Sequence, residues 1–114
     1  MGGLGNDHFT VRAIKSEVDG ALGSFGAWLI EPYTDKTDFL GQNTTEISEV
    51  ATIADMAYEH GLQLCVHAIG DRANTEVLDI FEKKIKSGEI MINTGSMPIN
   101  QRGRTNMIKI SSIE

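Results

Sequence analysis

Two residues with chemically capable side chains, Lys15 and His67, each stand at the last position of a predicted strand. In parallel α/β folds the functional groups gather at the carboxyl ends of the strands. Side chains alternate along a strand, so Lys15 shares a face with Ala13, and His67 shares one with Gln63 and Cys65. If the two strands are neighbours, we expect an amine and an imidazole to converge on one cavity.

Three further polar residues follow these strand ends, and each has a structural alternative. Asp19 could orient a ligand or begin a turn. Asp71 and Arg72 could line a substrate pocket, but Asp71 could equally cap the following helix and Arg72 could pair with an acid. For Lys15 and His67 the alternatives are a solvated lysine and a hydrogen-bonded histidine.

The segments that position these residues alternate between strands and helices. They are a strand at 9–15, a long glycine-containing loop at 19–41, a helix between an N-cap at Asn43 and a stop at Gly61, a strand at 62–67, and a helix at 73–87. Trp28, Leu29 and Ile30 are the expected apolar anchor of the loop. This order predicts an α/β fold with a parallel sheet and a right-handed crossover.

Three regions follow from this pattern. We expect a flexible leader at 1–8, a βαβα region at 9–88 and a tail at 89–114. In the tail, Glu89 to Ile92 could form a short strand, Asn93 to Arg104 is typical of a loop, and Met107 to Ile113 alternates weakly.

Composition argues against several classes of protein. The chain has 114 residues, 40% of them hydrophobic and 23% charged, which is ordinary for one small globular domain. A net charge of −6 gives no basic surface for nucleic acid, and no apolar run reaches the roughly 20 residues of a membrane span. Cys65 is the single cysteine, so no internal disulfide forms and a cytoplasmic location is expected.

Two segments resemble paired signatures of the metal-dependent amidohydrolase superfamily, in its branch of D-aminoacylase-like and N-substituted formamide deformylase-like enzymes. They are VRAIKSEVDGALGSFGAWLIEPYTD and CVHAIGDRAN, with AYEHG between them. The resemblance covers residues 9–87. It implies a (β/α)8 TIM barrel that uses one or two divalent metals, usually zinc, to activate water against an amide or related carbon–nitrogen bond of a small-molecule substrate.

The resemblance also implies roles for two residues. Lys15 matches the family's fourth-strand lysine, whose amine can be carboxylated, and His67 matches the fifth-strand histidine ligand. A protonated lysine repels a cation, whereas a carbamate presents two anionic oxygens that can bridge metals about 3.5–4 Å apart. A neutral imidazole nitrogen binds zinc at about 2.0–2.1 Å.

The departures from the family pattern concern the rest of the site. The sequence has no His-x-His pair, no histidine after His67 and no candidate for the late aspartate that shuttles protons, so no catalytic residue is assigned. A barrel of this type takes about 250 residues. We therefore expect a fragment of a hydrolase that is inactive by itself. The alternative is a non-catalytic interaction or small-ligand-binding module, and exposed strand edges would favour a homo-oligomer in either case.

Overall fold

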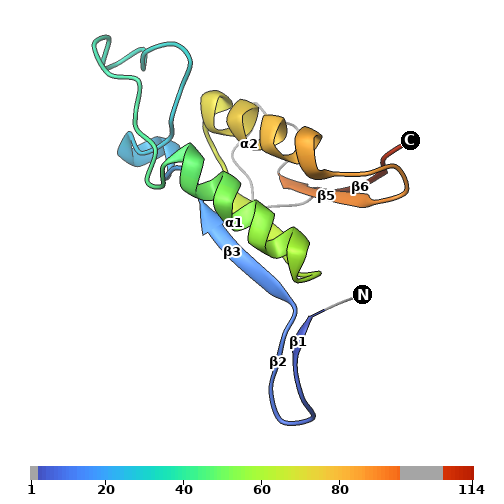
Figure 1. Cartoon of the computed structure of the whole chain (residues 1–114). Helices are drawn as coiled ribbons and strands as arrows, with labels where there is room; N and C mark the ends of the chain where they lie inside the picture. The colour runs from blue at the N-terminus through green and yellow to red at the C-terminus, as the bar shows by residue number, and fades with distance from the viewer. Residues whose placement is uncertain (1–2, 96–106) are drawn as a thin grey trace. The chain divides into compact units, whose positions relative to one another are not determined.

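The computed structural model describes residues 3–95 and 107–114 (Figure 1). The chain divides into two compact units, Met1–Lys84 and Ile85–Glu114. The elements of the first unit are β1 (Leu4–Gly5), β2 (Thr10–Val11), β3 (Ala13–Glu17), a short 3-10 helix (Leu22–Ser24), α1 (Ile47–Glu59), β4 (Gln63–His67) and α2 (Asp71–Lys84).

The predicted parallel pairing is present between β3 and β4, with α1 as the crossover between them. The prediction of one strand over residues 9–15 is wrong in its bounds. Its first part, β2, pairs with β1 in an antiparallel hairpin, while β3 pairs with β4 and continues to Glu17. The change of partner at Arg12 separates the two strands. Lys15 therefore lies in the middle of β3 and not at its end, whereas His67 does end β4.

Residues of the predicted leader take part in the hairpin. Leu4 and Gly5 form β1, and the Asn6 side chain accepts hydrogen bonds from the backbone N–H groups of His8 and Phe9 at 2.9 and 3.1 Å. An asparagine that bonds the backbone two residues ahead is a common turn former. This turn reverses the chain between β1 and β2.

Helix α1 buries one stripe formed by Val50, Ala54 and Ala57. The spacing of three or four residues puts these small and branched side chains on one face of the helix. The predicted N-cap at Asn43 is wrong, because the helix begins at Ile47 and the Asn43 side chain bonds Thr45 instead. The predicted stop is confirmed: Gly61 follows the helix with a φ of 63°, which glycine adopts without a steric cost.

Helix α2 begins two residues before the predicted start at Ala73 and ends at Lys84, short of the predicted end at Ser87. It packs against α1, and Lys84 forms an ion pair with Asp55 of that helix. The buried core of the unit consists of Val18, Val50, Ala54, Ala73, Val77 and Ile80, with Leu64 and Val66 of β4 packed against it. Both helices therefore share a core with one face of the parallel pair.

The second unit is an antiparallel hairpin of β5 (Ile90–Gly95) and β6 (Met107–Ser112), in which Ile92 is opposite Ile110. The short strand considered at Glu89 to Ile92 is present as β5, and the weakly alternating stretch from Met107 to Ile113, for which no strand was predicted, contains β6. The loop predicted from Asn93 to Arg104 is wrong for its first residues, which belong to β5, and from residue 96 onward it lies outside the described residues. Two backbone hydrogen bonds, from Gly88 to Ile113 and from Ile113 to Glu89, close the open end.

The architecture is thus a mixed α/β arrangement with parallel and antiparallel strand pairs. Among the described residues, neither α1 nor α2 has the length and apolar character of a membrane span.

Val50 supplies the first test, because its side chain is fully buried between the helices and the strands. We expect Val50→Ala to lower the free energy of unfolding by about 1–3 kcal/mol through lost apolar burial and a residual cavity. Urea unfolding followed by the fluorescence of Trp28, the single tryptophan, measures this. Thr52→Ala removes a side chain of similar shape from an exposed position of α1 and should have a much smaller effect. Equal losses in both variants would contradict this core.

Candidate functional site

The parallel register determines which side chains of β3 and β4 share a face. Lys15 is opposite Cys65, and Glu17 is opposite His67. Neighbours in register point to the same side of a sheet, and residues two apart along a strand do so as well. Lys15, Glu17, Cys65 and His67 therefore lie on one face, which we call the Lys15 face. The opposite face, with Val66, is packed under the helices.

Lys15 is accessible on this face. Its Nζ lies 3.8 Å from Glu17 Oε1 and 3.5 Å from the carbonyl oxygen of Ser16, and the Lys15 and Glu17 side chains are 55% and 66% exposed. An ion pair with this exposure contributes little to stability, because water screens both charges. His67 is half-buried at the end of β4, and its carbonyl oxygen accepts a hydrogen bond from Val18 N–H at 2.9 Å.

The donor types on the Lys15 face suit a borderline metal such as zinc, which takes imidazole nitrogen, thiolate sulfur and carboxylate oxygen. Their arrangement does not complete a site. Within residues 3–95 and 107–114, no three His, Cys, Asp or Glu side chains lie close enough to hold a metal ion together. A catalytic zinc normally has three protein ligands. The face thus fits part of a ligand set, and no catalytic step can be assigned to these residues alone.

Asp19 holds the ends of the two strands together. Its side chain is buried, with 1% of its surface exposed. Oδ2 accepts hydrogen bonds from the N–H groups of Trp28 and Gly70, and Oδ1 accepts one from Ile69, each at 2.8 Å. One carboxylate therefore ties the loop after β3 to the turn after β4. Of the two roles considered for Asp19, the structure supports the organisation of the turn, and ligand binding stays a prediction.

Close backbone contacts surround this carboxylate. A Cβ atom on Gly70 would lie 1.9 Å from the carbonyl oxygen of Trp28, and one on Gly41 would lie 1.9 Å from that of Ala27. Only glycine permits either approach. The Ala27–Trp28 segment is therefore held between the end of the loop and the start of α2.

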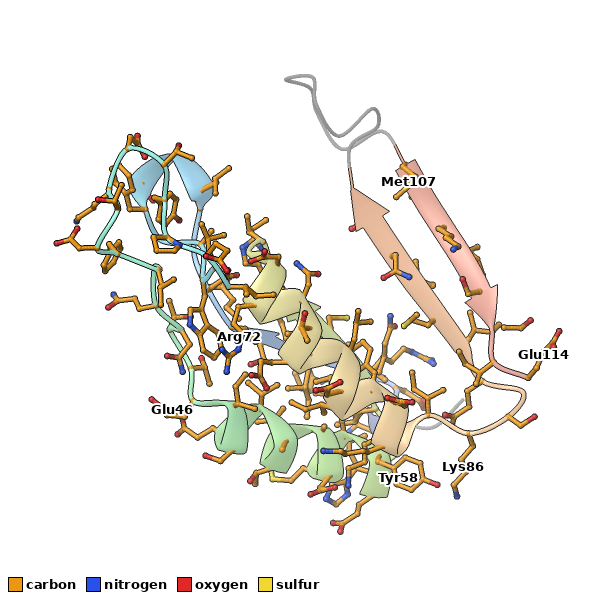
Figure 2. All side chains as sticks on the ribbon, turned by 90° about the horizontal axis from the view of Figure 1, so that it is seen from above. Glu46, Tyr58, Arg72, Lys86, Met107 and Glu114 are labelled. Carbon is orange, nitrogen blue, oxygen red and sulfur yellow. The ribbon has the colours of Figure 1, made fainter. Side chains whose placement is uncertain are left out.

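Asp71 and Arg72 also join the loop to α2. Asp71 Oδ1 accepts hydrogen bonds from the N–H groups of Ile30 and Arg72 at 2.9 and 2.8 Å. Arg72, labelled in Figure 2, lies on α2. Its guanidinium lies 5.0 Å from the centre of the Trp28 ring, and its Nε donates to Glu76 Oε1 at 2.8 Å. The expected pairing of Arg72 with an acid is confirmed, while a substrate role for either residue stays a prediction.

The long loop contains an aromatic cluster that sequence reasoning missed. The Tyr33 ring packs edge-on to Phe25 and stacks on Phe39, with centroids 5.0 and 6.3 Å apart. Lys36 Nζ lies 4.3 Å from the centre of the Phe39 ring, and the buried Tyr33 hydroxyl donates to Ala27 O at 2.8 Å. The signal available in the sequence was the presence of Phe25, Tyr33 and Phe39, in addition to Trp28, in a loop rich in turn-forming residues. Of the expected anchor, Trp28 and Leu29 are half-buried and Ile30 is exposed.

A hollow of about 380 Å³ lies beside this cluster. Its apolar lining consists of Leu22, Phe25, Leu29, Pro32 and Tyr33, with Thr34 and Asp35 as polar members. A volume of this size corresponds to the lower end of small-molecule pockets, which run from about 300 to 1,000 Å³.

The match to known proteins agrees with this arrangement. Residues 2–103 match the model of the amidohydrolase family, and the chain belongs to that family. The chain is 39% identical over 80 residues to YtcJ of Bacillus subtilis (strain 168), a protein ascribed to the amidohydrolases. It is 36% identical over 69 residues to the protein LONG AFTER FAR-RED 3 of Arabidopsis thaliana.

Two solved structures are similar to this chain, both described as uncharacterized metal-dependent hydrolases. The one from Pyrococcus horikoshii OT3 superimposes on 73% of the chain with a TM-score of 0.64, and the one from Pyrococcus furiosus on 74% with a TM-score of 0.65. Each is 36% identical in sequence.

The matched part is a small share of each relative. It spans 60% of this chain but 12% of the Arabidopsis protein, and 70% of this chain but 15% of YtcJ. For the solved structures the shares are 17% and 18% of their chains. Most of each relative therefore has no counterpart in these residues.

Asp19→Asn tests the carboxylate that joins the strand ends. We expect it to lower the free energy of unfolding by about 2–4 kcal/mol, because an amide oxygen cannot replace two carboxylate oxygens and buried N–H groups lose their acceptor. Chemical unfolding measures the loss. The matched control is Asp38→Asn in an exposed part of the loop, which should change stability by less than about 0.5 kcal/mol. Similar values for the two variants would argue against the bridging role.

Gly70→Ala tests the close approach to Trp28. The added methyl group would overlap the Trp28 carbonyl oxygen. We therefore expect the free energy of unfolding to fall by about 3 kcal/mol and amide hydrogen exchange at Trp28 and Ile69 to become faster. Gly23→Ala is the control, because nothing lies within 4 Å of a Cβ at that position. Unchanged exchange at Trp28 in the Gly70 variant would show that the turn adapts without releasing Asp19.

Proposed function

We propose that this chain supplies two neighbouring strand–helix units of a metal-dependent amidohydrolase barrel, with Lys15, as a carbamate, and His67 as two of the metal ligands. The substrate would be a small molecule with an amide or related carbon–nitrogen bond. Zinc is the expected ion. When bound, the metal would supply activation of water for the attack on that bond.

One observation carries this proposal: the parallel register puts Lys15 and His67 on the same face of adjacent strands, two positions apart along the sheet. Family membership and the likeness to metal-dependent hydrolases support the same reading. In a barrel of this class, catalytic groups come from the carboxyl ends of several strands. Strands β3 and β4 would contribute two such groups, and other segments would contribute the remaining ligands.

The chain's own residues would perform three tasks in such a site. The Lys15 carbamate and the His67 imidazole would hold the metal. Asp19 would keep the end of β4, and with it His67, aligned with β3 through the N–H groups of Ile69 and Gly70. The hollow beside Tyr33 would take an apolar part of the substrate. Residues behind a metal ligand hold that ligand in the orientation that binding requires. The hydrogen bonds of Asp19 would therefore serve metal binding as well as the stability of the fold.

The proposal also assigns the chain to one branch of the amidohydrolase superfamily. Residues 11–35 and 65–74 carry the resemblance to the D-aminoacylase and N-substituted formamide deformylase branch. We place the enzyme in the cytoplasm, where an unpaired, half-buried Cys65 stays reduced.

A second candidate is a non-catalytic module that has kept the fold without the chemistry. The observation in its favour is the absence of any three-ligand metal cluster among the described residues, together with a carboxylate, Glu17, beside the amine of Lys15. In this case the same face would bind a small ligand or another chain.

Metal binding by the full chain distinguishes the two candidates. The protein is dialysed against zinc in bicarbonate buffer, so that the Lys15 amine can take up CO2, and bound zinc is measured by elemental analysis. Under the first proposal, Lys15→Ala and His67→Ala each weaken binding by more than about tenfold, since even outer-shell partners of metal ligands are worth 10–100-fold. Isotope-labelled bicarbonate should give a carbamate NMR signal that Lys15→Ala removes.

His60→Ala is the matched control, because His60 is exposed at the end of α1, away from the Lys15 face. It should bind zinc as the parent does. Zinc binding that depends on His60 but not on His67 would contradict the proposed ligands. Zinc binding that neither Lys15→Ala nor His67→Ala weakens would favour the non-catalytic module.

A further inference from the structure

Glu17 is the acidic residue of the Lys15 face, and the proposed function gives it no task. It is the last residue of β3, and the register places it opposite His67 at the end of β4. Neighbouring strands are about 4.8 Å apart, so a carboxylate and an imidazole begin from adjacent positions on one face. The Glu17 side chain is 66% exposed, and its Oε1 lies 3.8 Å from Lys15 Nζ. Glu17 thus has a metal-ligand candidate on each side.

The Lys15 amine lies near the end of β3, although the Lys15 backbone lies in the middle of the strand. Its Nζ is 3.5 Å from the carbonyl oxygen of Ser16 and 3.8 Å from Glu17 Oε1, so the side chain extends along the strand toward Glu17. Cys65 is opposite Lys15 in the register, two residues before His67. The amine is therefore directed toward the level of Glu17 and His67, beyond that of Cys65.

We infer that Glu17 is a third metal ligand, which joins the Lys15 carbamate and His67 on the face formed by β3 and β4. The inference rests on the proposed function, because it takes the carbamate and the imidazole as ligands. Zinc binds imidazole nitrogen and carboxylate oxygen, and a catalytic zinc normally has three protein ligands and an open position. With Glu17, two adjacent strands of this chain supply that number of ligands.

Carbamate formation changes the charge beside Glu17. The Lys15 ammonium loses one proton, its nitrogen attacks the carbon of CO2, a C–N bond forms as one C–O π bond breaks, and a second proton leaves to water. The Lys15 side chain changes from a cation to an anion, so the Glu17 carboxylate then has a like charge beside it. A divalent cation bound by both groups removes this repulsion. Together with a neutral His67 imidazole, the complex has no net charge.

The ligand set forms only after carboxylation. Among the residues that the structure describes, no three His, Cys, Asp or Glu side chains lie close enough to hold a metal ion together. Glu17 and His67 are two donors at the strand ends, and a protonated Lys15 amine is not a donor. The carbamate supplies the third. We therefore expect metal binding by this chain to require bicarbonate or CO2.

The zinc affinity of the full chain in bicarbonate buffer, measured by competition with a coloured chelator, tests the inference. We expect the parent to bind zinc and Glu17→Gln to raise the dissociation constant at least about tenfold, since even residues behind a metal ligand contribute about 10–100-fold. Glu17→His should bind zinc more tightly than Glu17→Gln, because both variants remove the negative charge but only imidazole is a common zinc ligand. This comparison separates a ligand from a nearby charge.

Glu59→Gln is the matched control, because it removes a negative charge from an exposed position next to His60 at the end of α1. It should bind zinc as the parent does. Since Glu17 is exposed, Glu17→Gln should also unfold at nearly the same urea concentration as the parent. A weaker affinity for zinc in this variant is then a loss of binding and not a loss of the fold.

The possible results separate the inference from the proposed function. A parent chain that binds no zinc would overturn the inference and leave Lys15 and His67 as ligands that need other segments. Zinc binding that Lys15→Ala and His67→Ala abolish but Glu17→Gln leaves unchanged would also overturn it, and would support the proposed function with two ligands. The same holds if Cys65→Ser weakens binding in place of Glu17→Gln, or if Glu17→His and Glu17→Gln are equally weak. Binding that none of these variants weakens would contradict the proposed function itself.

Discussion

The arrangement of the first unit depends on the carboxylate of Asp19. It is buried, and its two oxygens accept three backbone N–H groups that belong to the loop after β3 and to the turn after β4. These donors have no partner within a helix or strand, and leaving them without an acceptor would carry a large desolvation cost. A single side chain thus satisfies both chain reversals, and Gly41 and Gly70 permit the backbone to come close enough for it to do so.

The candidate site follows from this constraint and from the register of β3 and β4. Asp19 fixes where β4 ends, and the register then determines that Lys15 and His67 share a face. The helices cover the other face, so the polar side chains are left on the side that a barrel interior would occupy. Under the proposed function this face would contribute at least two metal ligands, and the remaining ligands would come from other segments.

Much of the first unit could be predicted from local patterns in the sequence. Alternation in residues 62–67 and the stripe around Val50 correctly indicated β4 and α1, because each pattern repeats within one element. The bounds of β3 and the start of α1 were wrong, since they depend on partners: Gln63 N–H bonds Arg12 O, and Thr44 N–H bonds Val18 O. The bonds from Ile69 and Gly70 to Asp19 could not be foreseen, because these two donors are fifty residues or more away in the sequence.

The long loop narrows to a neck where Leu29 N–H bonds Leu40 O at 2.7 Å, and Tyr33 N–H bonds Phe39 O farther along the loop. Residues 30–39 are therefore a lobe whose two ends meet. Lengthening such a lobe at its exposed tip adds little closure entropy and leaves the neck unchanged. We therefore expect an insertion between Thr34 and Thr37, which are exposed, to change the outer part of the loop while β3, β4 and the residues that they carry keep their positions.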